Sequence, residues 1–264
     1  MNKTKAAQIR RADPAADIAQ INQYSKKELT PEEVYCFSVR LCDNEVDRDN
    51  ERFTDSTLAA LVPLFLGKPC LMDHRWSAEK QIARLYRTEV VDTGEENSLG
   101  GSLLALMGSA YMVRNGQTAS MIDAIEGGIL KEISVGCAVK SCSCSICGEA
   151  QELDWRTGKF LCKNGHIRGD HYDGRLCCGN LEGAEDAYEI SFVAVPSQRG
   201  AGVTKEAANL DEAFQILQAA DLSGHEAQIQ ALRLKFQTAL SDAAERAARQ
   251  KILAENRQYL QQKG

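Results

Sequence analysis

The sequence predicts an α+β fold in which strands form the body and helices lie at its periphery. Apolar residues alternate with smaller or polar ones over residues 35–41, which is the two-residue period of a strand. Over residues 55–65 they recur instead at helical spacing, and Gly67 is placed to end that helix. Two segments with similar wording, KEISVGCAV at 131–139 and YEISFVAVP at 188–196, indicate two further strands.

The remaining elements divide the chain into three parts. Segments 82–91 and 102–113 resemble strands, and Thr118 is placed to cap a short helix that Gly127 and Gly128 end. We expect a charged lead-in over residues 1–32, a main domain over 33–204 with an insertion at 141–180, and a helical extension over 205–264. A coiled-coil-like 3-4-3-4 seam runs along that extension through Ile229, Leu232, Phe236, Ala239 and Ala243. The extension is either a helix packed on its own domain or a tail that binds a partner.

Charge and hydropathy exclude several classes of protein. The formal net charge of −6 argues against broad nucleic-acid binding, which needs a basic face. The longest apolar stretch, residues 58–66, is interrupted by Pro63 and is too short to cross a bilayer. The charged N-terminal segment has no apolar core of the secretory type. We therefore expect a cytosolic protein whose thiols stay reduced.

The cysteines indicate a metal site in the insertion. Six of the ten cysteines fall within residues 142–178, and in a reducing compartment such crowding favours a metal over disulfides. Cys144 and Cys147 form a two-cysteine knuckle, Cys162 follows after fourteen residues, and His166 after three more. This Cys₃His set suits a tetrahedral structural zinc that would stabilise a loop poor in apolar residues.

Two questions about this metal site stay open in the sequence. The fourth ligand could instead be His171, Cys177 or Cys178, and Cys142 could replace Cys144. A zinc finger that reads nucleic acid is the rival interpretation, but no recognition helix is visible in the insertion.

His74 and Ser134 are the candidate catalytic residues outside the insertion. His74 follows Asp73 in the segment GKPCLMDH. Ser134 lies on the 131–139 strand, on the face opposite Ile133, with Gly136 beside it. We interpret this glycine as leaving room for a substrate backbone. A serine on a strand is a working nucleophile if a histidine on a neighbouring strand can accept its proton.

Three short motifs in order resemble one known family. GKPCLMDH, then GGILKEISVG, then YEISFVAVPSQRGAG are similar to the tailed-phage prohead proteases, which share the herpesvirus assemblin-type fold. The resemblance covers about residues 34–204, and it implies a mainly antiparallel β-barrel of the herpesvirus-protease type in this protease-like domain. The chain departs from the usual pattern by its zinc knuckle, which resembles one branch of the family, and by SQRGAG after Pro196.

The resemblance also implies an activity and site residues. His74 would be the general base, Ser134 the nucleophile, and Glu189 the residue that orients His74, with Asp73 or Asp186 as alternatives. The chain would be a serine endopeptidase that cleaves bacteriophage scaffold and coat-protein segments within the assembling prohead, in the host cytoplasm. Coat and scaffold proteins would be its partners, and a homo-oligomer is compatible with the family. The alternative is a non-catalytic, zinc-stabilised capsid or scaffold protein.

Overall fold

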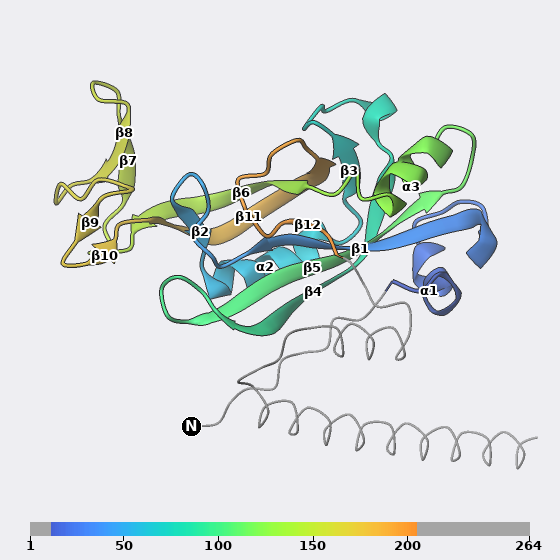
Figure 1. The fold of residues 1–264 in the computed structure, drawn as a ribbon, viewed down its shortest axis with the longest axis horizontal. Helices are drawn as coiled ribbons and strands as arrows, with labels where there is room; N and C mark the ends of the chain where they lie inside the picture. Colours follow the sequence, from blue (N-terminus) through green and yellow to red (C-terminus); the bar gives the residue numbers. More distant parts are fainter. Residues whose placement is uncertain (1–11, 205–264) are drawn as a thin grey trace, which may run out of the picture. The chain divides into compact units, whose positions relative to one another are not determined.

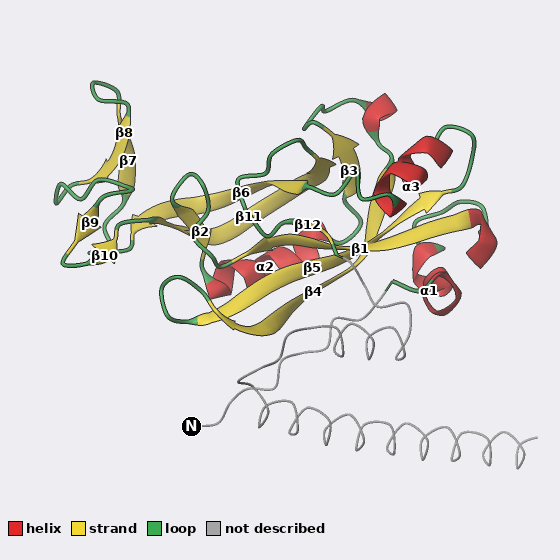
Figure 2. Ribbon diagram, viewed as in Figure 1, coloured by secondary structure: helices red, strands yellow, loops and turns green. Residues whose placement is uncertain are grey.

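The computed structural model describes residues 12–204, which form an α+β unit of mostly strands in a mixed open sheet with three α-helices (Figure 2). The predicted helical extension over 205–264 and its seam lie outside the described residues. The helices are α1 (Pro14–Ile21), α2 (Asp55–Phe65) and α3 (Ala119–Glu126), with two 3₁₀ turns, η1 (Pro31–Glu33) and η2 (Ala78–Lys80). None of the described helices has the length and apolar character needed to cross a membrane.

Twelve strands are described, and most of the residues predicted to be extended lie in them. The strands are β1 (Val34–Asp43), β2 (Glu51–Phe53), β3 (Pro69–Met72), β4 (Ala83–Glu96), β5 (Ser102–Val113), β6 (Ile133–Cys144), β7 (Gln151–Asp154), β8 (Lys159–Cys162), β9 (His171–Tyr172), β10 (Arg175–Leu176), β11 (Gly179–Phe192) and β12 (Gly202–Val203). Strand β11 ends at Phe192 rather than at the predicted Pro196. The Val193 N–H then turns to the carbonyl of Glu132, 3.1 Å away.

The main sheet has the strand order β12-β1-β5-β4-β3-β11-β2, and β6 pairs with β11. Its pairs are antiparallel except those of β11 with β2 and β3. The described strands do not form the predicted closed barrel: an isolated bridge joins Glu132, just before β6, to Gly202 of β12, but β6 and β12 form no ladder. Strand β12 has two residues and is too short to continue that bridge into a ladder.

One apolar core holds the sheet to helix α2. Phe37 and Leu41 of β1, Phe65 of α2, and Ile133 and Phe192 of β6 and β11 are all buried in it. Figure 1 shows α2 lying across the strands. Burial of a large apolar side chain contributes about 1.5–3 kcal/mol. Strands β6 and β11, which carry Ser134 and Glu189, and β3, which His74 follows, are therefore anchored in the main core.

The described part of the predicted lead-in is packed against the main domain. In helix α1, Ile21 and Asp17 are fully buried. The Asp17 carboxylate accepts hydrogen bonds from the Tyr86 hydroxyl and from Arg87 of β4, both at 2.9 Å. A charged residue tolerates such burial only when it is paired and hydrogen-bonded. Segment 12–32 therefore belongs to the folded unit, although its composition suggested a separate lead-in.

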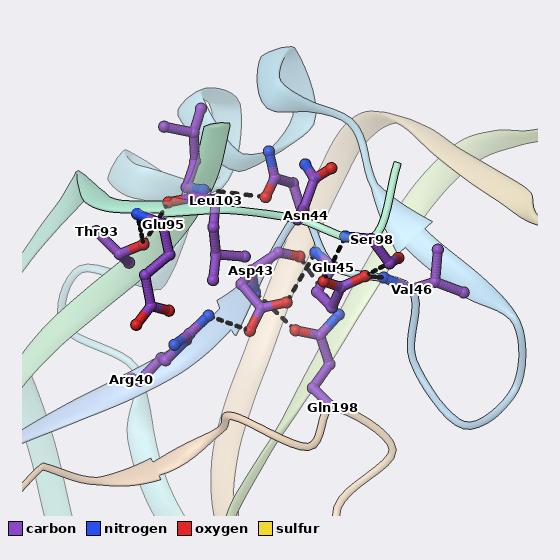
Figure 3. Close-up of polar contacts among 12 residues, drawn as sticks. Arg40, Asp43, Asn44, Glu45, Val46, Thr93, Glu95, Ser98, Leu103 and Gln198 are labelled. Atoms are coloured by element: carbon purple, nitrogen blue, oxygen red, sulfur yellow. Dashed lines mark hydrogen bonds and ion pairs between the residues drawn. The ribbon is translucent and has the colours of Figure 1, made fainter. Parts of the chain in front are cut away.

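A buried polar network fixes the return of the chain toward β12 (Figure 3). The Gln198 amide brackets the backbone of Asp43, accepting from its N–H at 2.6 Å and donating to its carbonyl at 3.3 Å. The Asp43 carboxylate lies 2.7 Å from the Arg40 guanidinium. Burial raises the pKa of Asp43, and the Arg40 charge opposes that rise. The end of β1 is thereby joined to the segment that follows β11.

Candidate active site and metal centre

His74 lies in a tight turn directly after β3. Asp73 and His74 both have positive φ angles, 55° and 52°, which are costly for residues with a β-carbon. Hydrogen bonds hold the turn: the Asp73 N–H donates to the Phe192 carbonyl at 2.9 Å, and the Arg75 N–H to the Met72 carbonyl at 3.0 Å. The turn carries the His74 backbone away from the sheet and leaves its side chain 41% exposed.

The structure brings His74 to Glu189, which is 115 residues away in the sequence. His74 Nδ1 lies 2.7 Å from Glu189 Oε1, and the carboxylate side chain is only 2% exposed. A carboxylate accepts the proton on Nδ1, which leaves the lone pair of Nε2 free to act as a base. The two alternatives do not take this place: Asp186 pairs with Lys68 at 3.4 Å, and no hydrogen bond joins Asp73 to the imidazole among residues 12–204.

Ser191 joins this pair and was not identified from the sequence. Its hydroxyl donates to Glu189 Oε2 and accepts from the His74 backbone N–H at 3.1 Å. The residue is fully buried. Because Ser191 follows Glu189 by two residues on one strand, the alternation of strand faces already placed both side chains on the same side. That signal was available, but it could not show that the His74 turn lies over them.

Ser134 lies on the neighbouring strand, on the face that carries Glu189 and Ser191. In the antiparallel β6–β11 ladder, Ser134 is opposite Ser191, and Gly136 is opposite Glu189. Directly opposed residues of a ladder place their side chains on the same face. The topology thus gathers His74, Glu189 and Ser134 on one side of three adjacent strands.

The interpretation of Gly136 as room for a substrate is wrong. A β-carbon built on Gly136 would lie 2.4 Å from Glu189 Oε1, so the missing side chain makes space for the carboxylate itself. Any larger residue there would displace Glu189 from His74. The glycine is therefore part of the support of the His–Glu pair, and the sequence could not reveal this without the cross-strand register.

Ser134 is half-buried and lines a small cleft of about 150 Å³. Its polar lining also includes Asp49 and Ser197, and its apolar lining includes Leu41 and Val135. Within the described part of the chain, no hydrogen bond joins the Ser134 hydroxyl to His74. Catalytic hydrogen bonds are often long before substrate binds.

An exposed aromatic pair borders the His74 turn. The rings of Trp76 and Tyr188 are 5.4 Å apart between centroids, and Trp76 is 73% exposed. The β6–β11 register shifts between Ala187 and Glu189, so Tyr188 stands at an irregularity of the ladder. Such bulges re-aim a side chain. Here the re-aimed side chain is that of Tyr188, which precedes Glu189 directly in the sequence. Its partner Trp76 follows His74 by two residues.

The predicted metal ligands come together at the far end of the β6–β11 ladder. Ligand atoms of Cys144, Cys147, Cys162 and His166 all lie within 4.8 Å of one another. His166 Nδ1 is 3.3 Å from Cys147 Sγ, 3.5 Å from Cys162 Sγ and 3.8 Å from Cys144 Sγ. Metal–sulfur bonds of ~2.3 Å and metal–nitrogen bonds of ~2.0 Å place tetrahedral ligands roughly 3.5–3.8 Å apart. This cluster can therefore bind a metal such as zinc.

The local backbone prepares Cys147 for a cation. A hydrogen bond from the Glu149 backbone is the main cause that lowers the pKa of the Cys147 thiol to about 6. A thiolate, not a thiol, is the species that ligates a metal. Gly148, with φ of 76°, forms the turn behind the knuckle. None of the alternative ligands belongs to this four-residue cluster in the described chain, neither His171 and Cys142 nor Cys177 and Cys178.

The segment around the cluster has little apolar support of its own. Its apolar cluster consists of Cys144, Cys162 and Cys177, with Ile146 and Tyr172 partly buried against them. Figure 1 shows its short hairpins, β7–β8 and β9–β10, beyond the end of β6 and β11. We call residues 145–178 the metal module. Its order depends on what holds the cluster together rather than on a core.

Arg168 links the metal module to the main sheet. Its guanidinium forms an ion pair with Glu51 of β2, donates to Gln151 Oε1 at 2.9 Å and to Cys142 Sγ at 3.2 Å, and lies 4.1 Å from the centre of the Phe160 ring. The side chain is only 6% exposed. Sequence reasoning missed this role, because a single arginine in a polar loop carries no signal of its partners.

Comparison with protein-family models and with curated proteins finds no match for this chain.

Proposed function

We propose that this chain is a serine endopeptidase of the prohead-maturation type. The observation that carries the proposal is the 2.7 Å contact between His74 Nδ1 and the buried Glu189 carboxylate, beside a strand that presents Ser134 on the same face. Histidine, an orienting carboxylate and a serine on adjacent elements are the components of an acyl-transfer site. The mixed sheet is compatible with a herpesvirus-protease type of fold, which is part of the proposal.

The proposed reaction follows from the tautomer of His74. Glu189 accepts the Nδ1 proton, so Nε2 takes the Ser134 hydroxyl proton as the oxygen attacks a substrate carbonyl. The proton then passes from Nε2 to the leaving amine, and an acyl-enzyme remains on Ser134. Water, deprotonated by the same nitrogen, releases the acyl group and restores the hydroxyl. His74 thus acts as general base and then as general acid, while Glu189 orients it.

The resemblance of three motifs to prohead proteases supplies the substrate class. The proposed substrates are scaffold and coat-protein segments of a bacteriophage, cleaved within the prohead in the host cytoplasm. The net charge of −6 favours protein partners over nucleic acid. We propose that the Cys₃His cluster holds a structural zinc, since four protein donors leave no open position for a substrate or water.

An active-site probe tests the nucleophile without knowledge of the substrate. A fluorophosphonate phosphonylates an activated serine with loss of fluoride. We expect one adduct on the Ser134 peptide of the full chain, seen by mass spectrometry, and none in Ser134→Ala or His74→Ala. Ser141→Ala, an exposed serine on the same strand, is the matched control and should be labelled like wild type. Absence of labelling in wild type would contradict an activated serine.

Co-expression with coat protein tests the substrate class and the second candidate function. The second candidate is a zinc-stabilised capsid protein without catalysis, which would use the Cys₃His cluster to hold its fold. We expect wild type to shorten the coat or scaffold protein and Ser134→Ala to leave it intact. Equal intact masses in both co-expressions would favour the non-catalytic candidate.

A further inference from the structure

We propose that Cys177 is a fifth donor of the metal centre, able to complete a four-sulfur site when His166 is withdrawn. Cys177 Sγ lies 3.6 Å from Cys144 Sγ, the same separation as that between Cys147 Sγ and Cys162 Sγ. Two thiolates on one tetrahedral ion are roughly 3.8 Å apart when each bond is ~2.3 Å. Cys177 therefore already lies at a ligand's distance from one member of the cluster.

The surroundings of Cys177 hold its sulfur toward the cluster. The residue is fully buried, its backbone N–H donates to the Asp170 carbonyl at 2.8 Å, and the Gln151 amide lies 3.4 Å from its sulfur. The neighbouring Cys178 is equally buried, but among residues 12–204 no hydrogen bond joins its sulfur to the cluster. The contact of the Cys177 sulfur with Cys144, and not burial, distinguishes the two cysteines, which both lie between β10 and β11.

His166 is the ligand that Cys177 can replace. Its side chain is the only nitrogen donor in the cluster that the described residues form, and it is more exposed than Cys144 or Cys162. Cys177 and His166 enter from different loops, so one can leave the ion while the other approaches. A soft ion such as zinc accepts either Cys₃His or Cys₄.

Cobalt substitution tests this proposal by a readout independent of any enzymatic activity. In the full-length chain loaded with Co²⁺, we expect a three-sulfur spectrum for wild type and for Cys177→Ser. His166→Ala should still bind one Co²⁺, with d–d bands at longer wavelength and thiolate charge-transfer intensity about one third higher, because four sulfurs replace three. The double variant His166→Ala/Cys177→Ser should bind at least tenfold more weakly than His166→Ala.

The matched control is His166→Ala/Cys178→Ser, which should keep the four-sulfur spectrum. The proposal is overturned if His166→Ala binds no cobalt, if its spectrum retains three sulfurs, or if adding Cys177→Ser changes neither spectrum nor affinity. It is also overturned if Cys178→Ser has the effect expected of Cys177→Ser.

A second, independent observation concerns the catalytic face. We infer that Ser191 is a positioning residue that fixes both His74 and Glu189, and this inference rests on the proposed function. One buried hydroxyl accepts from the His74 backbone N–H at 3.1 Å and donates to the free oxygen of Glu189. It therefore links the His74 backbone to the Glu189 carboxylate, which orients the imidazole ring.

The strain of the His74 turn explains why such a tie is needed. Two consecutive residues with positive φ persist only where the surroundings determine them. The Ser191 hydroxyl supplies the hydrogen bond to the second of them, and Ser191 is itself fixed by the β6–β11 ladder opposite Ser134. Loss of the hydroxyl would leave a buried carboxylate oxygen without its donor and release the His74 backbone.

Labelling rates distinguish positioning from general stability. Ser191→Ala should lower the fluorophosphonate labelling rate of Ser134 at least tenfold, and Ser191→Thr, which keeps a hydroxyl, should restore most of it. Glu189→Gln/Ser191→Ala should be no slower than Glu189→Gln, since both act through His74. Equal rates for wild type and Ser191→Ala, or multiplying effects in the double variant, would overturn the inference.

A nuclear magnetic resonance measurement separates this inference from the proposed function. We expect the His74 Nδ1 proton to give a slowly exchanging downfield signal in wild type and in Ser191→Thr. In Ser191→Ala this signal should be absent. Absence of that signal from wild-type protein that has not reacted with the fluorophosphonate would count against the proposed function alone. A retained signal in Ser191→Ala would count against the role of Ser191.

Discussion

The two ends of the β6–β11 ladder hold their functional side chains by different physical means. At one end, Ser134 and Ser191 lie over Ile133 and Phe192, which are buried in the main core. At the other end, Cys144 and Gly179 are the last opposed pair before the metal module, which has a small cluster of its own. Burial in the main core supports the first group of side chains, whereas the second group lies in a segment with little apolar support and four potential metal ligands. The proposed catalytic site and the proposed metal centre should therefore respond to different perturbations.

Metal removal should produce the largest difference in stability between the two ends of the ladder. Binding at Cys/His sites supplies on the order of 10 kcal/mol, and the metal module has no comparable apolar burial. We expect a chelator to bring amides of residues 145–178 to near-unprotected hydrogen exchange, while β1 and β5 keep their protection. Cys147→Ser should reproduce this loss, whereas Cys36→Ser, outside the cluster, should not. Equal loss in both regions would show that the module supports the whole sheet.

A truncation in the main core should destabilise the main sheet and leave the metal module unchanged. Phe192→Ala removes a fully buried ring from the main core, so we expect it to lower the free energy of unfolding by about 3–5 kcal/mol. Urea denaturation followed by circular dichroism measures this change. The metal stoichiometry of the folded variant should remain that of wild type. Trp155→Ala, an 87% exposed ring in the module, is the control and should change the free energy of unfolding little.

Arg168 tests whether the two regions are coupled. Its truncation to alanine removes charge-assisted contacts to Glu51 and Gln151, which are each worth about 1.5–3 kcal/mol. We expect increased exchange in β2 and in the module without loss of the metal. Arg156→Ala, at an exposed position of the same module, should leave exchange unchanged. If Arg168→Ala changes hydrogen exchange no more than Arg156→Ala does, the two regions are independent.

The smallest expected change in stability comes from Gly136→Ala. The new β-carbon would meet Glu189 Oε1 at 2.4 Å, so the carboxylate must shift at a cost of about 1–2 kcal/mol. The effect on labelling of Ser134 should be larger than the effect on stability, because the shift separates Glu189 from His74. Ala138→Gly on the same face is the control for strand propensity. Normal labelling of Gly136→Ala would contradict the support role of Gly136.

The sequence by itself determined the local elements and the kinds of chemistry that the chain can carry. The bounds of α2 and β5 follow from apolar periodicity, which reports the environment of each side chain at short range. The Cys₃His set follows from the spacing of the knuckle, because its ligands are close in the chain. The open sheet, rather than the barrel implied by resemblance, depends on pairings between distant strands.

Only the tertiary structure decided which distant residues meet. Glu189 was one of three carboxylates that the sequence allowed for His74, and the selection was made by the β3–β11 pairing, which brings residues 115 positions apart into contact. Ser191, Gly136 and Arg168 gain their roles in the same way. Contacts across strands depend on register and on which turn lies above which strand, and a local pattern of residues contains neither.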